Sequence, residues 1–122
     1  MNGKASHHIW RERPLEALRG NITRRYVTSD RMMLGEVTFE KGDSVPPHRH
    51  ENEQFTHVLR GCLKFTLGDK GEDTVVVAAG EVIVIPSDLL HAVEALEDTL
   101  EYDMFTPPRQ DWIDSESAFL RG

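Results

Sequence analysis

The sequence predicts a single all-β domain, built as a sandwich or barrel of short strands. A chain of 122 residues fits one compact domain and leaves no room for a second. Apolar and polar residues alternate along 33–39 and along 62–67, which is the period of a strand with one buried face. Glycine-rich turns separate these segments at short intervals, and this spacing is typical of sandwiches and barrels.

Further strands complete the expected architecture. Residues 75–77 and 82–85 are β-branched and almost continuously apolar, so we expect strands that are buried on both faces. Another strand is expected over 100–105, ended by the pair of prolines that follows it. Weak helix signals lie at 14–18 and 112–120.

The charge balance limits the classes of partner. Fourteen Lys and Arg residues against 21 Asp and Glu residues give a net charge of −7. This argues against nucleic acids and anionic membranes, which both require a cationic surface. No apolar run approaches the roughly 20 residues of a membrane helix, and the first residues lack a secretory signal. Because the single cysteine, Cys62, cannot form an internal disulfide, the sequence predicts a cytoplasmic protein.

A histidine-rich segment carries the strongest functional signal. His48, His50 and Gln54 share parity on an extended strand, so their side chains are expected on one side of it. Glu53 has the opposite parity and is expected to point away. Two imidazoles and an amide oxygen suit a borderline divalent metal ion. An exposed His-x-His without a partner is the alternative, but the full spacing of glycines, histidines and glutamine favours a metal site.

The same segment resembles the first motif of the cupins. That motif runs Gly, five residues, His-x-His, three residues, Glu, six residues, Gly; Gly42 and Gly61 match it, and Gln54 occupies the Glu position. The segment from Gly80 to His91 resembles the second cupin motif, with Asp88 where glycine is usual.

This resemblance implies a cupin double-stranded β-helix, which is a jelly-roll barrel. It also implies that His91 completes the metal site from another strand, and that the cofactor is one divalent transition metal (Ni, Zn, Mn or Fe). We expect an N-terminal extension over 1–21, the barrel over 22–107 and a C-terminal tail over 108–122.

Three polar or aromatic residues near the C-terminus have chemistry that fits such a site. Asp103 and Phe105 share one face of the last expected strand, where a carboxylate near a cation can transfer protons. Arg109 offers a planar fork that suits a substrate carboxylate. Alternatively, Asp103 is a solvated strand residue and Arg109 pairs with Asp111 at the surface.

The segment from Leu100 to Trp112 is similar to the end of the KdgF family, small cupins of pectin and alginate breakdown that end in Asp-x-Phe-Thr-Pro-x-Arg. Residues 32–42 and 48–54 are also similar to that family. The resemblance implies conversion of 4,5-unsaturated uronates to their linear ketonised form. Asp103 would move protons, Arg109 would hold the C6 carboxylate of the substrate, and Phe105 would shape the pocket.

A neutral ligand set has a chemical consequence. Three imidazoles and the Gln54 amide leave the charge of the metal uncompensated, which makes it a stronger Lewis acid and attracts an anionic substrate. This favours a non-redox, isomerase- or lyase-like enzyme acting on a sugar acid. The alternatives are another metal-dependent cupin enzyme (a dioxygenase, lyase or sugar isomerase) and a non-catalytic protein that binds small molecules.

Three further expectations concern the surroundings of the site. A homodimer is expected from the cupin resemblance, with residues 22–27 as the suspected contact. Residues 94–101 are expected at a solvated hairpin edge. Trp112 is expected to fasten the C-terminal segment rather than to contact a ligand.

Overall fold

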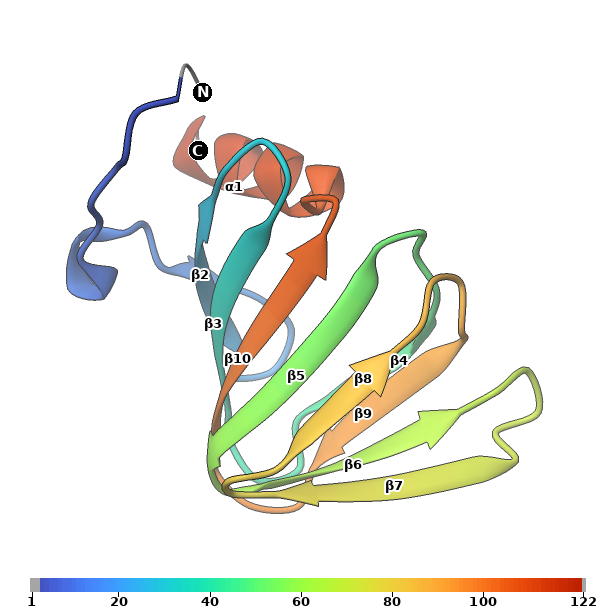
Figure 1. The fold of residues 1–122 in the computed structure, drawn as a ribbon. Coiled ribbons are helices and arrows are strands. Elements are labelled where there is room, and N and C mark those ends of the chain that lie inside the picture. Colours follow the sequence, from blue (N-terminus) through green and yellow to red (C-terminus); the bar gives the residue numbers. More distant parts are fainter. Residues whose placement is uncertain (1–2, 122) are drawn as a thin grey trace.

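The computed structural model describes residues 3–121, with side chains described for 3–118. Two antiparallel sheets face each other and enclose the core (Figure 1). The larger sheet has the order β1-β2-β3-β10-β5-β8, and the smaller has the order β4-β9-β6-β7. The strands are β1 (Glu16–Ala17), β2 (Thr23–Thr28), β3 (Met33–Phe39), β4 (Ser44–His48), β5 (Glu53–Arg60), β6 (Cys62–Leu67), β7 (Asp73–Ala78), β8 (Val82–Ile85), β9 (His91–Ala95) and β10 (Thr99–Thr106).

The alternation in the sequence becomes the inner and outer faces of the strands. In β3 every second residue is buried, and β10 alternates in the same way along its whole length. The strands predicted over 33–39, 62–67 and 100–105 are therefore confirmed. The buried side chains of the two sheets meet in one apolar core, which contains Phe65 and Phe105.

Two predictions about secondary structure and its burial were wrong. β7 and β8 were expected to be buried on both faces, but Val76, Val82 and Val84 are exposed. The reason is that each sheet packs against the core with one face only, and these valines lie on the outer faces; Val84 shares that face with the exposed Phe55 of the neighbouring strand β5. The weak helix signal at 14–18 was also wrong, because this segment contains the short strand β1, which pairs with β2.

The C-terminal helix α1 (Gln110–Arg121) packs across the inner side of the larger sheet near β2 and β3 (Figure 1). Trp112 lies against β3 at Gly35, where an added Cβ would be 2.6 Å from the Cζ3 atom of Trp112. The Tyr26 hydroxyl donates a hydrogen bond of 3.1 Å to Glu116. The helix predicted over 112–120 is confirmed and starts two residues earlier.

The outer face of the larger sheet carries a row of apolar side chains. These are cross-strand neighbours on β2, β3, β10, β5 and β8: Val27, Leu34, Met104, Phe55 and Val84. By contrast, Ile22 and Tyr26, in the segment suspected of forming a dimer contact, are buried within the chain's own core. Within residues 3–121, no helix combines the length and apolar character needed to cross a membrane.

Candidate metal centre and ligand cavity

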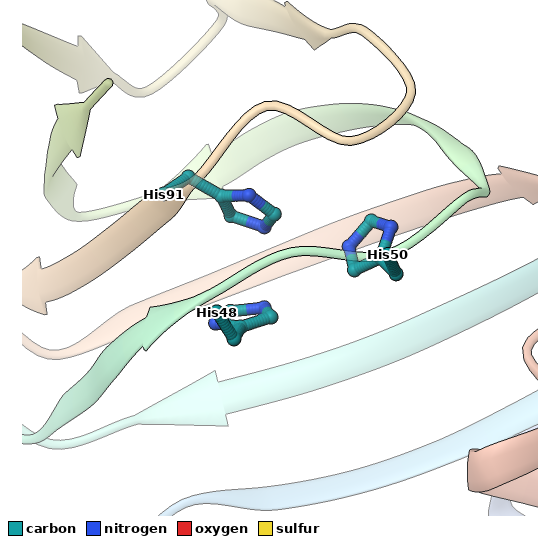
Figure 2. Close-up of side chains that lie close together, drawn as sticks. All are labelled: His48, His50 and His91. Atoms are coloured by element: carbon teal, nitrogen blue, oxygen red, sulfur yellow. The ribbon is translucent and has the colours of Figure 1, made fainter. Parts of the chain in front are cut away.

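Three histidines from two neighbouring segments converge between the sheets (Figure 2). His48 ends β4 and His91 begins β9, and the two are paired across the antiparallel strands. The sequence predicted that His50 lies on one extended strand with His48 and Gln54. This was wrong, because β4 ends at His48 and β5 begins at Glu53. The intervening loop still points the His50 ring toward the other two rings.

Each ring is oriented by a hydrogen bond to the main chain. The Nδ1 atoms donate to carbonyl oxygens two residues away: His48 to Pro46 (3.0 Å), His50 to Asn52 (2.9 Å) and His91 to Leu89 (2.8 Å). Because a carbonyl oxygen can only accept, the proton of each neutral ring lies on Nδ1, and the lone pair lies on Nε2. This arrangement is typical of histidines that bind a metal.

The arrangement of these lone pairs fits a cation. The ligand atoms of the three histidines lie within 4.8 Å of one another. The buried Nε2 of His91 has no hydrogen-bond partner among the described residues. The Nε2 of His50 lies 3.1 Å from the Oε1 of Gln54, so two acceptors face each other there. A metal ion would satisfy all of these atoms, since imidazole nitrogen and amide oxygen are both ligands for a divalent transition metal.

The histidines are also held in the form that binds a metal. Burial lowers the pKa of His91 to about 4. Burial and the positive charge of Arg109 lower the pKa of His50. At neutral pH both rings are therefore uncharged, so neither must lose a proton before an ion binds.

Gln54 faces the same point from β5. Its side chain is buried whereas that of Glu53 is exposed, as the parity argument predicted. The Nε2 of Gln54 donates to the Thr56 hydroxyl (2.9 Å), which turns Oε1 toward His50. Gln54 is thus the side chain placed to offer a fourth, neutral donor.

Two loop contacts tie the histidine loop to its surroundings. The N–H of Asp88 donates to the carbonyl oxygen of His50 (2.8 Å). Asp88 has a φ of 64°, a left-handed conformation that explains why glycine is usual at this position in the motif. The Asn52 side chain donates to the carbonyl oxygens of Pro107 (2.6 Å) and Pro108 (3.2 Å). These contacts hold the segment before Arg109 next to the histidine loop.

Asp103 lies beside Gln54 on the inner face of β10. It is buried, so the alternative of a solvated strand residue was wrong. Its Oδ1 accepts hydrogen bonds from the Thr56 hydroxyl (2.6 Å) and, more weakly, from the Gln54 amide (3.5 Å). A short chain of hydrogen bonds therefore links this carboxylate to the histidine centre.

A second acid, Glu101, lies next to Asp103, and the sequence analysis missed it. Residues 94–101 were expected at a solvated edge, but Glu101 is 4% exposed. Burial raises the pKa of Glu101 well above its ordinary value, and the charge and hydrogen bond of Asp103 raise it further. Glu101 shares parity with Asp103 and Phe105, and this was the signal that could have identified it.

Arg109 and Phe105 form one wall of the site. Arg109 is buried, and its Nε and Nη2 atoms bind the two oxygens of Asp111 at 2.8 and 2.6 Å. The pairing with Asp111 that was considered from the sequence is thus present, between a buried arginine and an exposed carboxylate. The Arg109 guanidinium lies 5.0 Å from the centroid of the Phe105 ring, and the Nη1 atom stays available to another acceptor.

One cavity of about 460 Å³ joins most of these residues, and it is large enough for a small molecule. Its lining includes His48, His91, Gln54, Glu101, Asp103, Phe105 and Arg109. Trp112 lines it too, so the expectation that Trp112 only fastens the C-terminus was incomplete. Arg24 adds a second cation that the sequence analysis missed. Its guanidinium lies 4.4 Å from the Trp112 ring centroid, and its Nε lies 3.2 Å from Glu16.

A model of the cupin domain matches residues 35–105, more than half of the chain. The chain belongs to the cupin family. The matched region contains the three histidines, Gln54 and Asp103, and the two-sheet architecture is the jelly-roll barrel that the cupin motifs implied. A comparison with curated proteins found no match.

Solved structures similar to the chain include three cupin-like folds. KdgF from Halomonas sp. is 28% identical with a TM-score of 0.80, over 89% of this chain and 99% of that one. The polyketide cyclase RemF from Streptomyces resistomycificus is 27% identical with a TM-score of 0.71, over 86% and 83%. An RmlC-like cupin from Shewanella frigidimarina NCIMB 400 is 20% identical with a TM-score of 0.80, over 92% and 99%, which supports the fold alone.

The histidine centre predicts that His91→Ala weakens binding of Ni²⁺ by at least about 100-fold, because a proposed ligand is lost rather than a group that only orients a ligand. Isothermal titration calorimetry measures the affinity. His57→Ala is the matched control, because His57 lies on β5 but faces away from the cavity. Full metal occupancy in His91→Ala would contradict the assignment of this ligand.

The buried acid predicts a pH-dependent stability. Because the pKa of Glu101 is raised in the folded state, folding above the ordinary Glu pKa requires proton uptake, and the wild type loses stability as pH rises. Glu101→Gln should therefore gain in unfolding free energy relative to wild type by up to about 1.4 kcal/mol per pH unit above pH 4.5. Urea unfolding of the metal-free proteins between pH 4.5 and 8 measures this. A difference that stays constant with pH, as expected for the exposed Glu53→Gln control, would refute it.

Proposed function

We propose that this cupin is a metal-dependent, non-redox enzyme that converts 4,5-unsaturated uronates to their linear ketonised form. The observation that carries the proposal is the presence of a histidine centre, a buried aspartate and a buried arginine in one cavity. The likeness to KdgF, at 28% identity over nearly the whole length of both chains, supports the same function.

The proposed metal ligands are the Nε2 atoms of His48, His50 and His91 together with the Oε1 of Gln54. The expected ion is one divalent transition metal (Ni, Zn, Mn or Fe). When bound, the ion supplies Lewis acidity that polarises an oxygen atom of the sugar, since no ligand neutralises its charge.

The substrate is a small anionic sugar acid, and the cations of the cavity are proposed to orient it. The Nη1 edge of Arg109 would bind the C6 carboxylate, and Phe105 would support the guanidinium and the sugar ring from one side. Arg24, whose guanidinium lies 4.4 Å from the Trp112 ring centroid, would add positive potential at the same end of the cavity.

Asp103 is proposed as the group that moves protons. Ring opening removes the proton from the C1 hydroxyl and breaks the bond between C1 and the ring oxygen, which leaves an aldehyde at C1 and an enol at C5. Proton delivery to C4 and loss of the enol proton then give the ketone. The reaction is an isomerisation, so it requires neither an oxidant nor a reductant. Burial of Asp103 beside Thr56 and Gln54 keeps the carboxylate oriented for both transfers.

Another metal-dependent cupin reaction is the second candidate: a dioxygenase, a lyase or a sugar isomerase. The likeness to the polyketide cyclase RemF, at 27% identity, supports a cupin reaction other than uronate conversion as a candidate. A non-catalytic protein that binds a sugar acid is the third. Oxygen consumption separates a dioxygenase from the proposed enzyme, whose reaction should be equally fast without oxygen.

The proposed function predicts that the metal-loaded protein accelerates the loss of the ultraviolet absorbance of a 4,5-unsaturated monouronate. Asp103→Asn should lower kcat by about 100-fold or more while retaining the metal, because general acid–base catalysis contributes about 10²–10⁴ in rate. Asp69→Asn, at an exposed pair with Arg49, is the matched control and should retain full activity. Decay at the spontaneous rate with wild-type protein would refute the proposal.

We also propose that the protein is a cytoplasmic homodimer. The apolar row on the outer face of the larger sheet supports this, since Phe55, Val84 and Met104 are exposed there. Sedimentation velocity should give a dimer for wild type and a monomer for Phe55→Glu. A wild-type monomer at micromolar concentration would contradict the proposed assembly.

A further inference from the structure

Glu101 is a buried polar residue that the proposed reaction does not use. It lies on the inner face of β10, is 4% exposed and contributes to the wall of the cavity. One carboxyl oxygen engages Asp103, whereas Oε2 has no hydrogen-bond partner within the described part of the chain. A buried polar atom without a partner destabilises the folded state, so its retention needs an explanation.

The position of Glu101 sets it apart from the histidine centre. Along the inner face of β10, Phe105 is opposite Gln54, Asp103 is opposite Thr56, and Glu101 is opposite Val58. Residues two apart on a strand are separated by roughly 7 Å. Along β10, Glu101 therefore lies roughly 7 Å beyond Asp103 and roughly 14 Å beyond Phe105, the residue opposite Gln54, toward the apolar end of the cavity.

The chemistry of the free oxygen indicates what it binds. The neighbours of Glu101 on the adjacent strands are Val37 and Val58, which offer no hydrogen bond from their side chains. Burial raises the pKa of Glu101, so the group is protonated and donates to Asp103. Its other oxygen is then a carbonyl-like acceptor without a donor. A ligand that reaches this end of the cavity with a hydroxyl group would supply the donor.

We propose that Glu101 is a specificity-determining residue, whose free carboxyl oxygen accepts a hydrogen bond from a hydroxyl group of the bound sugar acid, at the end of the cavity remote from Arg109. The inference rests on the proposed function, because it takes a sugar acid as the ligand. It adds selection for a hydroxylated ring over an apolar ring that carries the same carboxylate.

The test compares two probes that differ only in their hydroxyl groups. D-galacturonate presents a carboxylate, a ring oxygen and hydroxyls, and tetrahydropyran-2-carboxylate presents the same skeleton without hydroxyls. Isothermal titration calorimetry with metal-loaded protein gives both dissociation constants for wild type, Glu101→Leu and Glu101→Gln. Glu94→Leu, an exposed acid on β9, is the matched control.

Glu101→Leu should weaken galacturonate binding by roughly 10- to 100-fold and leave tetrahydropyran-2-carboxylate binding unchanged or tighter. Glu101→Gln retains an acceptor oxygen and should bind galacturonate nearly as wild type does. The leucine removes an unsatisfied polar group from an apolar environment, so the variant should fold. Glu101→Met, unbranched and of similar length, serves as a second apolar variant.

Equal effects of Glu101→Leu on both probes, or no effect on either, would overturn the inference. Such a result would reduce Glu101 to a residue that only supports Asp103, because a structural role changes melting temperature or kcat but not the ratio of the two dissociation constants. Failure of wild-type protein to bind either probe would instead overturn the proposed function, and with it the inference. These two failures are distinguished by the wild-type titration alone.

Discussion

Each histidine of the centre donates its Nδ1 hydrogen to a main-chain carbonyl two residues away, and the chemistry of the cavity depends on that bond. It determines which nitrogen faces the interior and supplies a lone pair there before any ligand arrives. Burial then keeps two of the rings uncharged at neutral pH, His91 most strongly. The site is therefore organised to receive a cation without rearranging its side chains. Ordering these side chains on binding then costs little free energy.

The polar groups around this centre are arranged along the cavity by charge. Arg24 and Arg109 meet at the Trp112 ring, next to the helix α1, and each is paired with a carboxylate of its own. The uncharged ligand set lies beside them, and the acids Asp103 and Glu101 continue along β10. In the proposed function, an anionic group would bind at the arginine end, whereas proton transfer and hydroxyl recognition would take place at the acid end. The order of Glu101, Asp103 and Phe105 follows from alternate residues of β10, whereas Arg24 comes from β2 and Arg109 from the segment between β10 and α1.

Much of the site follows from the period of two residues in a strand. Gln54 is the inward residue and Glu53 the outward one, as parity predicted, although a loop over 49–52 interrupts the strand along which that parity was counted. The same rule identified Asp103 on the inner face. It failed to find Glu101 because the acidic residues that precede it gave the impression of a solvated edge, although its parity with Asp103 indicated burial.

Other features depend on tertiary contacts that no local pattern reveals. The loop that turns His50 inward is held by the N–H of Asp88 from a distant turn, and Trp112 reaches the cavity because Gly35 leaves room for its ring. Val84 is exposed because it lies on the outer face of the larger sheet, where Phe55 and Met104 are exposed as well. Sequence patterns thus predicted the elements and the chemistry, whereas the order of strands and the close contacts decided which residues meet.

The central claim is that one metal ion is bound by three imidazole nitrogens and a neutral oxygen in this cavity. X-ray absorption spectroscopy of the nickel-loaded protein tests it most directly, because the fine structure reports the number of imidazole ligands through their ring scattering. Three imidazoles and additional oxygen ligands are expected, with one imidazole lost in His50→Ala. A spectrum with one imidazole or none, or one that His50→Ala leaves unchanged, would contradict it.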